Sequence, residues 1–147
     1  MADYTERMIW LVKRAEMATQ QAKERTLRRH KITGAQHAAL TIINLYDGIT
    51  SAELARRCFV TAQTMNSTVS RLEAAKLVAR TAHPLHRNLI ELRLTEHGRQ
   101  VYARADAEVA ALDDQLAAGF AAAELRALKR ALTHIAAVAD EASSAQH

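Results

Sequence analysis

Apolar residues recur every three or four positions through most of this chain, which is the spacing of one face of an α-helix. The first such stripe runs from Tyr4 to Ala22 and predicts one long helix over residues 4 to about 30. Trp10 and Met17 lie off this stripe. The helix therefore has a second apolar face and needs two partners, its own fold and another subunit.

The next apolar segment, residues 36–46, is hydrophobic on nearly every side and predicts a central, largely buried helix. Two short helices follow. Thr50 and Glu53 have the spacing of a capping box, which begins a helix that ends at about Cys58. Thr61 then caps a second helix that ends at about residue 76. A pair of helices with so short a connection is typical of a helix-turn-helix motif.

The spacing changes from helical to alternating after Leu77. Residues 77–81 and 89–94 predict two strands, and the turn between them holds the only proline, Pro84. These segments predict one small β-hairpin with a charged tip.

Helical spacing returns from Glu96 onward. One apolar stripe covers residues 101–116, and a second, over residues 125–139, has the spacing of a coiled coil. The expected fold class is therefore mainly α with one small β-hairpin. Residues 143–147 are expected to form a disordered tail.

Charge and composition narrow the class of protein. The length of 147 residues is that of one domain. The net charge is +4, and residues 51–104 hold nine Lys or Arg against four acidic residues. This concentration of positive charge fits either a polyanion partner or a solvated charged surface.

Several other classes are excluded. A single cysteine excludes a disulfide framework and a thiolate zinc cluster and fits a reducing cytosol, so we expect a cytoplasmic protein. The apolar run Met8–Val12 is too short and too closely flanked by charges for a signal peptide or a membrane span. The sequence shows no nucleophile–base constellation, no Gly-rich phosphate loop and no metal cluster, so we expect neither an enzyme nor a cofactor.

Four stretches of the sequence resemble the MarR family of winged-helix regulators. Residues 50–57 read Thr-Ser-Ala-Glu-Leu-Ala-Arg-Arg, residues 60–65 read Val-Thr-Ala-Gln-Thr-Met, and residues 71–78 read Arg-Leu-Glu-Ala-Ala-Lys-Leu-Val. Residues 94–99, Leu-Thr-Glu-His-Gly-Arg, match the short LTxxG segment that follows the wing in this family.

The resemblance spans nearly the whole chain and implies one compact chain with two roles. Residues 35–95 would form a winged helix-turn-helix that binds DNA, and residues 1–34 and 96–142 would be dimerisation helices. The implied function is that of a ligand-responsive transcriptional regulator, with a repressor favoured. Its homodimer would bind a pseudo-palindromic operator in double-stranded DNA and would be released by a small aromatic or amphipathic anion.

The second helix of the pair would insert into the major groove. With its apolar face inward, it presents short polar side chains that can exchange hydrogen bonds with base edges. The alternative is an ordinary polar face in contact with water. The residues predicted to read bases are Gln63, Asn66 and Ser67.

Other side chains are predicted to contact the DNA backbone, because a helix N-terminus and nearby cations attract phosphate. Arg56 and Arg57 fit a role as mere surface charge equally well. The predicted backbone contacts are Thr61, Thr64, Ser70, Arg71, Arg56 and Arg57.

The wing tip departs from the family pattern. That pattern is Asp-x-x-Asp-Arg-Arg, whereas residues 83–88 read His-Pro-Leu-His-Arg-Asn. Arg87 aligns with the family's wing arginine, so the resemblance implies that Arg87 reads DNA in the minor groove. His83 and His86 replace both acidic residues, and their spacing on a tight hairpin without a third ligand predicts no metal site.

The resemblance also implies an effector pocket between the winged helix and the dimerisation helices. Trp10, Arg14 and Met17 offer an apolar wall with one cation. Trp10 could equally pack in the dimer interface. Polar contacts are expected from the second helix, at His37, Thr41 and Asn44.

Two other functions stay open. Cys58 could make the protein a redox-responsive regulator, although its position at the apolar end of a helix predicts burial rather than reactivity. A helical protein-interaction module without DNA binding is the other alternative.

Overall fold

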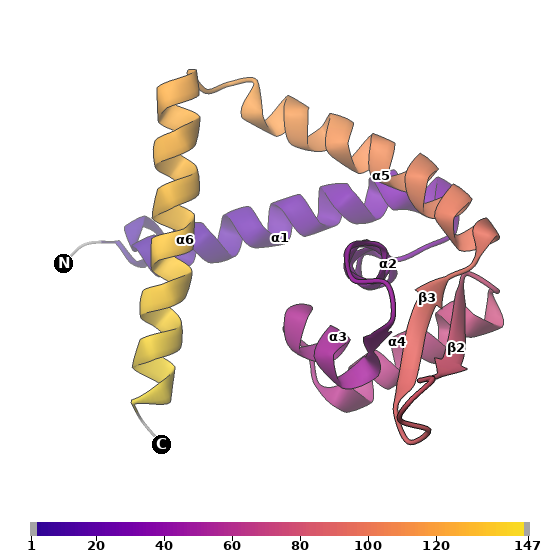
Figure 1. The fold of residues 1–147 in the computed structure, drawn as a ribbon. Coiled ribbons are helices and arrows are strands. Elements are labelled where there is room, and N and C mark those ends of the chain that lie inside the picture. Colours follow the sequence, from indigo (N-terminus) through magenta and orange to yellow (C-terminus); the bar gives the residue numbers. More distant parts are fainter. Residues whose placement is uncertain (1–2, 146–147) are drawn as a thin grey trace. The chain divides into compact units, whose positions relative to one another are not determined.

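The computed structural model describes residues 3–145 in two compact units, which divide after Ala110. The fold class is confirmed as mainly helical with a small antiparallel sheet. The elements in chain order, labelled in Figure 1, are η1 (Tyr4–Glu6), α1 (Met8–Leu27), η2 (Arg28–His30), α2 (Gly34–Leu45), β1 (Ile49–Thr50), α3 (Ser51–Arg57), α4 (Ala62–Ala74), β2 (Val78–Ala82), β3 (Ile90–Leu94), α5 (Glu96–Ala117) and α6 (Ala122–Ser144).

The core of the first unit is built around α2. This helix contacts α1, α3, α4 and β3, and Figure 1 shows it end-on between α1 and the α3–α4 pair. The prediction of a central, largely buried helix is therefore confirmed. The largest fully buried side chains are Leu27, Leu40, Ile43, Leu54, Leu72, Leu92 and Val69.

Three threonines begin the helices α2, α3 and α4. The Thr33 hydroxyl accepts a hydrogen bond from the Gln36 N–H at 3.1 Å, and the Gln36 side chain accepts one from the Thr33 N–H at 2.9 Å, which completes a capping box. Thr50 and Thr61 accept bonds from the backbone N–H three residues further on, at 3.3 and 3.1 Å. The predicted helix starts at Thr50 and Thr61 are thus confirmed, while α2 begins two residues earlier than expected.

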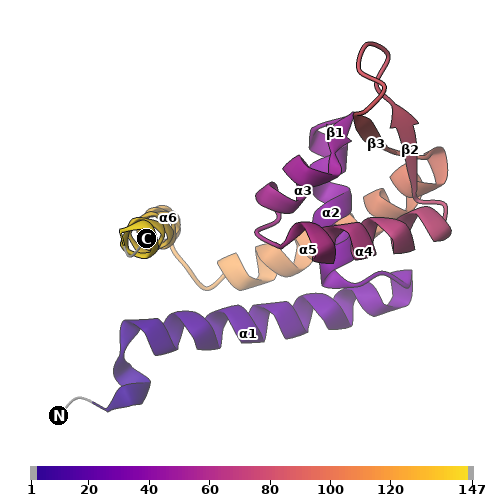
Figure 2. The same cartoon turned by 90° about the horizontal axis from the view of Figure 1, so that it is seen from below.

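The wing belongs to a three-stranded antiparallel sheet with the strand order β1-β3-β2. The predicted hairpin is present, but the sequence did not indicate the third strand, β1. It is only two residues long, and Ile49 pairs with Leu92. The N–H of Gly48 donates to the Leu92 carbonyl at 3.0 Å, from a φ of 87° that favours glycine. Figure 2 shows the connection between β2 and β3 extending away from the helices.

The junction between the sheet and α5 is closely packed. The Thr95 hydroxyl donates to the Lys76 carbonyl at 2.6 Å and accepts from the Gly98 N–H at 2.9 Å. A side chain at Gly98 would collide with the Leu77 carbonyl. The LTxxG segment therefore supplies both the cap and the close approach that this turn needs.

The second unit contains the end of α5 and the whole of α6. No residue between Ala122 and Ser144 is buried. The helix continues to Ser144, two residues into the predicted disordered tail, and residues 146–147 lie outside the described part of the chain. Among residues 3–145, no helix is both long and apolar enough to cross a membrane.

Candidate nucleic-acid interface

Helix α4 presents a polar face that does not contribute to the core. Met65, Val69 and Leu72 are buried, as predicted from the spacing. Gln63 and Ser67 are exposed on the other side of the helix. Their positions leave both side chains available to a ligand outside the protein.

Asn66 and Ser70, two predicted contact residues on α4, have partners on other elements of the protein. The Asn66 carbonyl oxygen accepts a hydrogen bond from the Ser51 hydroxyl at 2.8 Å, which directs the side chain and leaves the NH₂ group to donate elsewhere. The Ser70 hydroxyl accepts from Arg80 at 3.4 Å. Arg80 also lies 3.4 Å from Glu73 and brings a positive charge from β2 to α4. Neither Ser51 nor Arg80 was indicated by the sequence, since both act across elements.

The N-terminus of α4 is a candidate phosphate site. The Thr61 hydroxyl donates to the Thr64 hydroxyl at 2.9 Å, and both side chains are exposed. The first backbone N–H groups of this 13-residue helix point out from the same end. At the other end, Arg71 is exposed in the last turn.

Arg56 and Arg57 are engaged on α3. Both guanidinium groups pair with Glu53, and the Nε of Arg57 lies 2.8 Å from a carboxylate oxygen. Arg57 also stacks on the Tyr46 ring, 4.0 Å from its centroid. Because Glu53 is occupied by these arginines, the capping box expected at Thr50 forms only its hydroxyl half.

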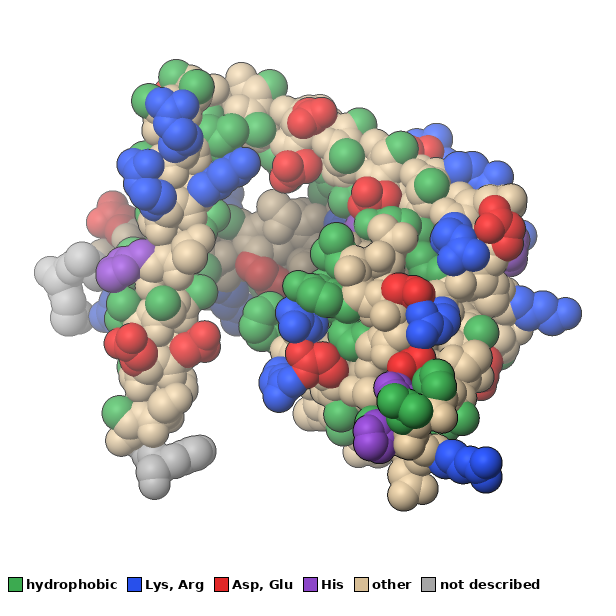
Figure 3. Space-filling model, viewed as in Figure 1, with side chains coloured by type: hydrophobic (Ala, Val, Ile, Leu, Met, Phe, Trp, Pro, Cys, Tyr) green, Lys and Arg blue, Asp and Glu red, His purple; other side chains and the backbone are tan. Residues whose placement is uncertain are grey.

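The wing tip carries an exposed cation and two histidines. Arg87 is exposed and forms no ion pair with any residue from 3 to 145. The rings of His83 and His86 lie 5.2 Å apart. Figure 3 shows histidine and apolar side chains together on the surface of the wing, at the lower right. Across the described part of the chain, no three His, Cys, Asp or Glu residues gather as a metal site would need.

The six residues predicted to line an effector pocket fall into two places. Trp10, Arg14 and Met17 lie along α1 and line a shallow hollow of about 260 Å³. The other three lie on α2. His37 is buried, and its Nε2 lies 3.0 Å from the Asp106 carboxylate of α5. The Thr41 hydroxyl donates to the His37 carbonyl at 2.8 Å, and Asn44 is exposed.

Partly buried polar groups surround His37. Its Nδ1 is buried without a hydrogen-bond partner among residues 3–145, and its ring lies 5.7 Å from the Tyr102 ring. Burial and the nearby Lys23 charge lower the pKa of His37, while Asp106 opposes this shift. Burial also lowers the pKa of Lys23. The sequence did not indicate Lys23, Tyr102 or Asp106, because the fold brings them together from distant helices.

Cys58 does not have the properties of a reactive thiol. It is partly buried against the core, and this burial raises the pKa of the thiol despite an opposing effect of Lys23. Reactive cysteines have a lowered pKa and an exposed sulfur. The chemistry of this position therefore disfavours the redox alternative.

A helix-turn-helix followed by a β-hairpin wing defines the class of winged-helix proteins. Residues 30–87 match the sequence profile of the MarR family. The HTH-type transcriptional repressor Rv2887 of Mycobacterium tuberculosis is 37% identical over 101 residues, which cover 69% of this chain and 73% of that protein. The chain belongs to the MarR family of transcriptional regulators and is not an enzyme.

Solved structures agree over nearly the whole length. The transcriptional repressor CouR bound to a 23-mer DNA duplex matches with a TM-score of 0.86 and 26% identity, covering 92% of this chain and 96% of that one. Rv2887 in complex with salicylic acid matches with a TM-score of 0.72 and 31% identity, covering 92% and 99%. Rv2887 in complex with DNA matches with a TM-score of 0.71 and 31% identity, covering 88% and 97%.

Proposed function

We propose that this protein is a transcriptional repressor that binds an operator in double-stranded DNA as a homodimer and leaves it when a small aromatic anion binds. The observation that carries the proposal is the exposed polar face of α4 together with the exposed Arg87 of the wing, which forms no ion pair with any residue from 3 to 145. Helices of this kind read the major groove. Two relatives, CouR and Rv2887, have been solved with DNA.

The residues of α4 divide between base edges and phosphates. Gln63 and Ser67 read bases with unoccupied polar groups, and Asn66 adds its NH₂ donors. Arg87 enters the adjacent minor groove, where a narrow, A·T-rich form attracts cations. The phosphate contacts come from Thr61, Thr64, Ser70 and Arg71, with Arg56 and Arg57 adding positive charge beside their Glu53 partner.

Homodimerisation is supported by apolar surface in both units. In α1, the exposed fraction of Met8 is 63% and that of Leu11 is 50%. In α6, Leu132 and Val138 are 50% and 49% exposed. We therefore assign DNA binding to residues 35–95 and dimerisation to residues 1–34 and 96–142. With two-fold symmetry, the half-site centres lie about 10 bp apart, one turn of DNA.

The effector is proposed to bind beside His37. The partly buried Lys23 suits a carboxylate, and the Tyr102 ring suits an aromatic body. The Nδ1 of His37, which has no hydrogen-bond partner among residues 3–145, suits a hydroxyl donor of the ligand, because Nε2 faces Asp106. The relative Rv2887 has been solved with salicylic acid and with p-aminosalicylic acid. Trp10, Arg14 and Met17 form a second candidate surface, and Thr41 and Asn44 supply outer polar contacts.

Salicylate titration distinguishes these two surfaces. Trp10 is the only tryptophan, so its fluorescence reports on α1. Lys23→Met should weaken salicylate binding if the ligand lies beside His37, whereas Lys13→Met should weaken it if the ligand lies in the α1 hollow. Salicylate that changes neither fluorescence nor DNA binding contradicts the effector proposal.

A gel-shift assay tests the DNA-binding proposal directly. The probe is the DNA upstream of the protein's own gene, and the competitor is random duplex of equal length. Specific binding of the dimer supports the proposal. If random duplex at equal concentration displaces the probe, the protein binds DNA only through electrostatic association. If the probe does not bind at all, a helical interaction module is favoured.

A further inference from the structure

The wing tip contains a histidine whose contacts the proposed function does not use. His83 stands where the family pattern has the first wing aspartate. Its Nδ1 accepts hydrogen bonds from the backbone N–H groups of Leu85 and His86, both at 3.1 Å. Aspartate and asparagine side chains close turns in this way. The ring of His83 therefore takes the place of a carboxylate as the acceptor that closes the tip.

These two hydrogen bonds define the state of the ring. A ring nitrogen accepts a hydrogen bond only when it carries no proton. The ring is therefore neutral when the tip is closed, and its one proton lies on Nε2. A protonated ring would direct an N–H from Nδ1 toward two backbone N–H groups, and both hydrogen bonds would be lost.

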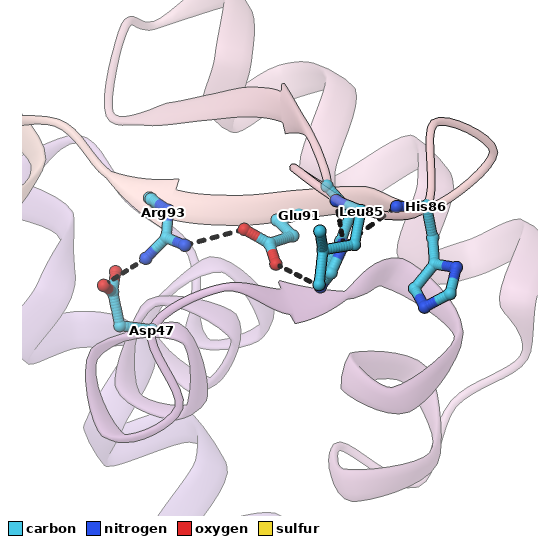
Figure 4. Close-up of polar contacts among 6 residues, drawn as sticks. Asp47, Leu85, His86, Glu91 and Arg93 are labelled. Carbon is cyan, nitrogen blue, oxygen red and sulfur yellow. Dashed lines mark hydrogen bonds and ion pairs between the residues drawn. The ribbon is translucent and has the colours of Figure 1, made fainter.

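The other edge of the ring is tied to the sheet. His83 Nε2 lies 3.5 Å from Glu91 Oε1, and the second carboxylate oxygen of Glu91 accepts from Arg93 at 2.6 Å. Arg93 also pairs with Asp47, just before β1. Figure 4 shows these contacts in sequence along the sheet. The chain of contacts runs from the tip along β3 to the loop before β1, and it ties the ring to both.

Titratable side chains near the ring come from the same turn and from the sheet. On the turn, the ring centroid of His86 lies 5.2 Å from that of His83. Arg80 of β2 pairs with Glu73 and is directly opposite Leu92, so it lies on the other face of the sheet from Glu91. Arg87 is the next residue after this turn, and it pairs with no carboxylate in the part of the chain that the structure describes.

We propose that His83 is the positioning residue of the wing: its neutral ring closes the tip and sets the position of Arg87, and protonation of the ring opens the tip. The DNA part of this inference rests on the proposed function. A proton on Nδ1 removes both hydrogen bonds to Leu85 and His86, so uptake of a proton by the ring opens the tip. An aspartate at position 83 offers a carboxylate acceptor in place of the ring and keeps the tip closed.

Nuclear magnetic resonance of the full-length free protein tests the first part. The ¹⁵N-labelled chain is titrated from pH 8 to 5.5, and the amide signals of Leu85 and His86 are followed. Both should shift upfield together with a single midpoint as their hydrogen bonds break. In His83→Asp both should stay in place. In His86→Gln, a matched control on the same turn, the transition should persist.

Two results overturn the inference. One is a pair of amide signals that do not move in the parent, or that move equally in His83→Asp. The other is a transition that disappears in His86→Gln, since it would then belong to His86. Neither result depends on DNA, so the test stands apart from the proposed function.

DNA affinity tests the second part through a double-mutant cycle at pH 8. His83→Ala should weaken duplex binding about threefold to tenfold, the range expected for losing the hydrogen bonds that order the tip. His83→Asp should restore it. In an Arg87→Ala background, His83→Ala should have no further effect, because the group it positions is gone. Equal losses in both backgrounds contradict the positioning role. The parent and all variants could fail to bind duplex while the amide transition is still observed. In that case the proposed function is wrong, and the inference that His83 closes the tip is still supported.

Discussion

At the scale of single residues, Gln63 and Arg87 offer DNA two different kinds of contact. Gln63 is a neutral amide on α4, whose bidentate pairing favours the N6 and N7 atoms of adenine. Gln63→Ala should therefore cost about 1–3 kcal/mol on the operator and relax the preference at one base pair per half-site, with little effect on random duplex. Arg87→Ala removes a charge, so it should weaken both complexes and reduce the slope of log affinity against log salt by about one per wing.

A salt titration of both variants on specific and random duplexes measures this difference. Arg126→Ala, an exposed cation of α6, is the control for a general loss of charge. If Gln63→Ala weakens both complexes equally, or if Arg87→Ala leaves the salt slope unchanged, then another element enters the groove.

Phe59 occupies a backbone conformation that favours glycine. It follows α3 with a φ of 58°, and its side chain is 93% exposed, so the ring gains almost nothing from packing. The hydrogen bonds from Phe59 to the Arg56 carbonyl at 3.3 Å and from Val60 to the Ala55 carbonyl at 3.1 Å form the Schellman motif, in which glycine is usual. Phe59→Gly should raise the free energy of unfolding by roughly 0.5–1 kcal/mol.

Denaturant unfolding at equal protein concentration measures this change. Phe59→Ala is the matched control, because it removes the ring but keeps a Cβ in the left-handed region. It should change stability by less than about 0.5 kcal/mol. An equal gain in both variants would show that the exposed ring, and not the backbone, is the source of the cost.

At the scale of elements, the sequence predicts what is encoded locally. The sequence predicts that helices begin at Thr50 and Thr61, because each hydroxyl caps the backbone N–H three residues further on. The apolar spacing of α4 predicts its buried face. By contrast, β1 has two residues and no period to detect, so its pairing with β3 follows only from the fold.

The candidate sites show the same limit. The polar face of α4 is predictable because helical geometry fixes which side chains share a face. The bond that occupies Asn66 comes from Ser51, 15 residues away, and the partner of His37 is 69 residues away. Such pairings depend on how helices cross, which no local pattern encodes. The hydrogen bonds of His83 in the wing could likewise not be predicted, because the family pattern has an aspartate at this position.

Gly98 is the clearest test of element packing. A Cβ at this position would meet the backbone carbonyl of Leu77, which also accepts from the Thr95 N–H at 3.0 Å and therefore has little freedom to move. Gly98→Ala should reduce the free energy of unfolding by about 1–3 kcal/mol, although alanine is the better helix former.

Gly119 provides the matched control for this substitution. A Cβ there has open space within 4 Å and the residue lies in the turn after α5. Gly119→Ala should therefore change stability by less than about 0.5 kcal/mol. If both variants lose a similar amount of unfolding free energy, the clash with the Leu77 carbonyl is not the cause of the loss in Gly98→Ala.

At the scale of the whole molecule, apolar surface is left without a partner in each unit taken alone. None of the 23 residues of α6 is buried, although Leu125, Leu128 and Leu132 form one stripe along it. A helix of this kind gains most of its stability from packing against a partner. A second copy of the chain is the partner proposed here, and two-fold symmetry would place the same stripe on both sides.

Loss of this stripe should separate the subunits. In the proposed dimer each subunit buries one Leu132, so Leu132→Glu places two charges in the interface. The free energy of dimerisation should weaken by about 3–6 kcal/mol for the two copies. His134→Glu, on the opposite side of α6, makes a similar change in charge and should leave the dimer intact. Sedimentation equilibrium over a range of concentrations measures both. Operator affinity should fall together with dimerisation in Leu132→Glu, because a monomer reaches one half-site only.

Ending the chain near residue 120 removes the whole stripe and should give an insoluble or unfolded product. A folded, monomeric, operator-binding protein from that truncation would contradict the assignment of residues 96–142 to dimerisation.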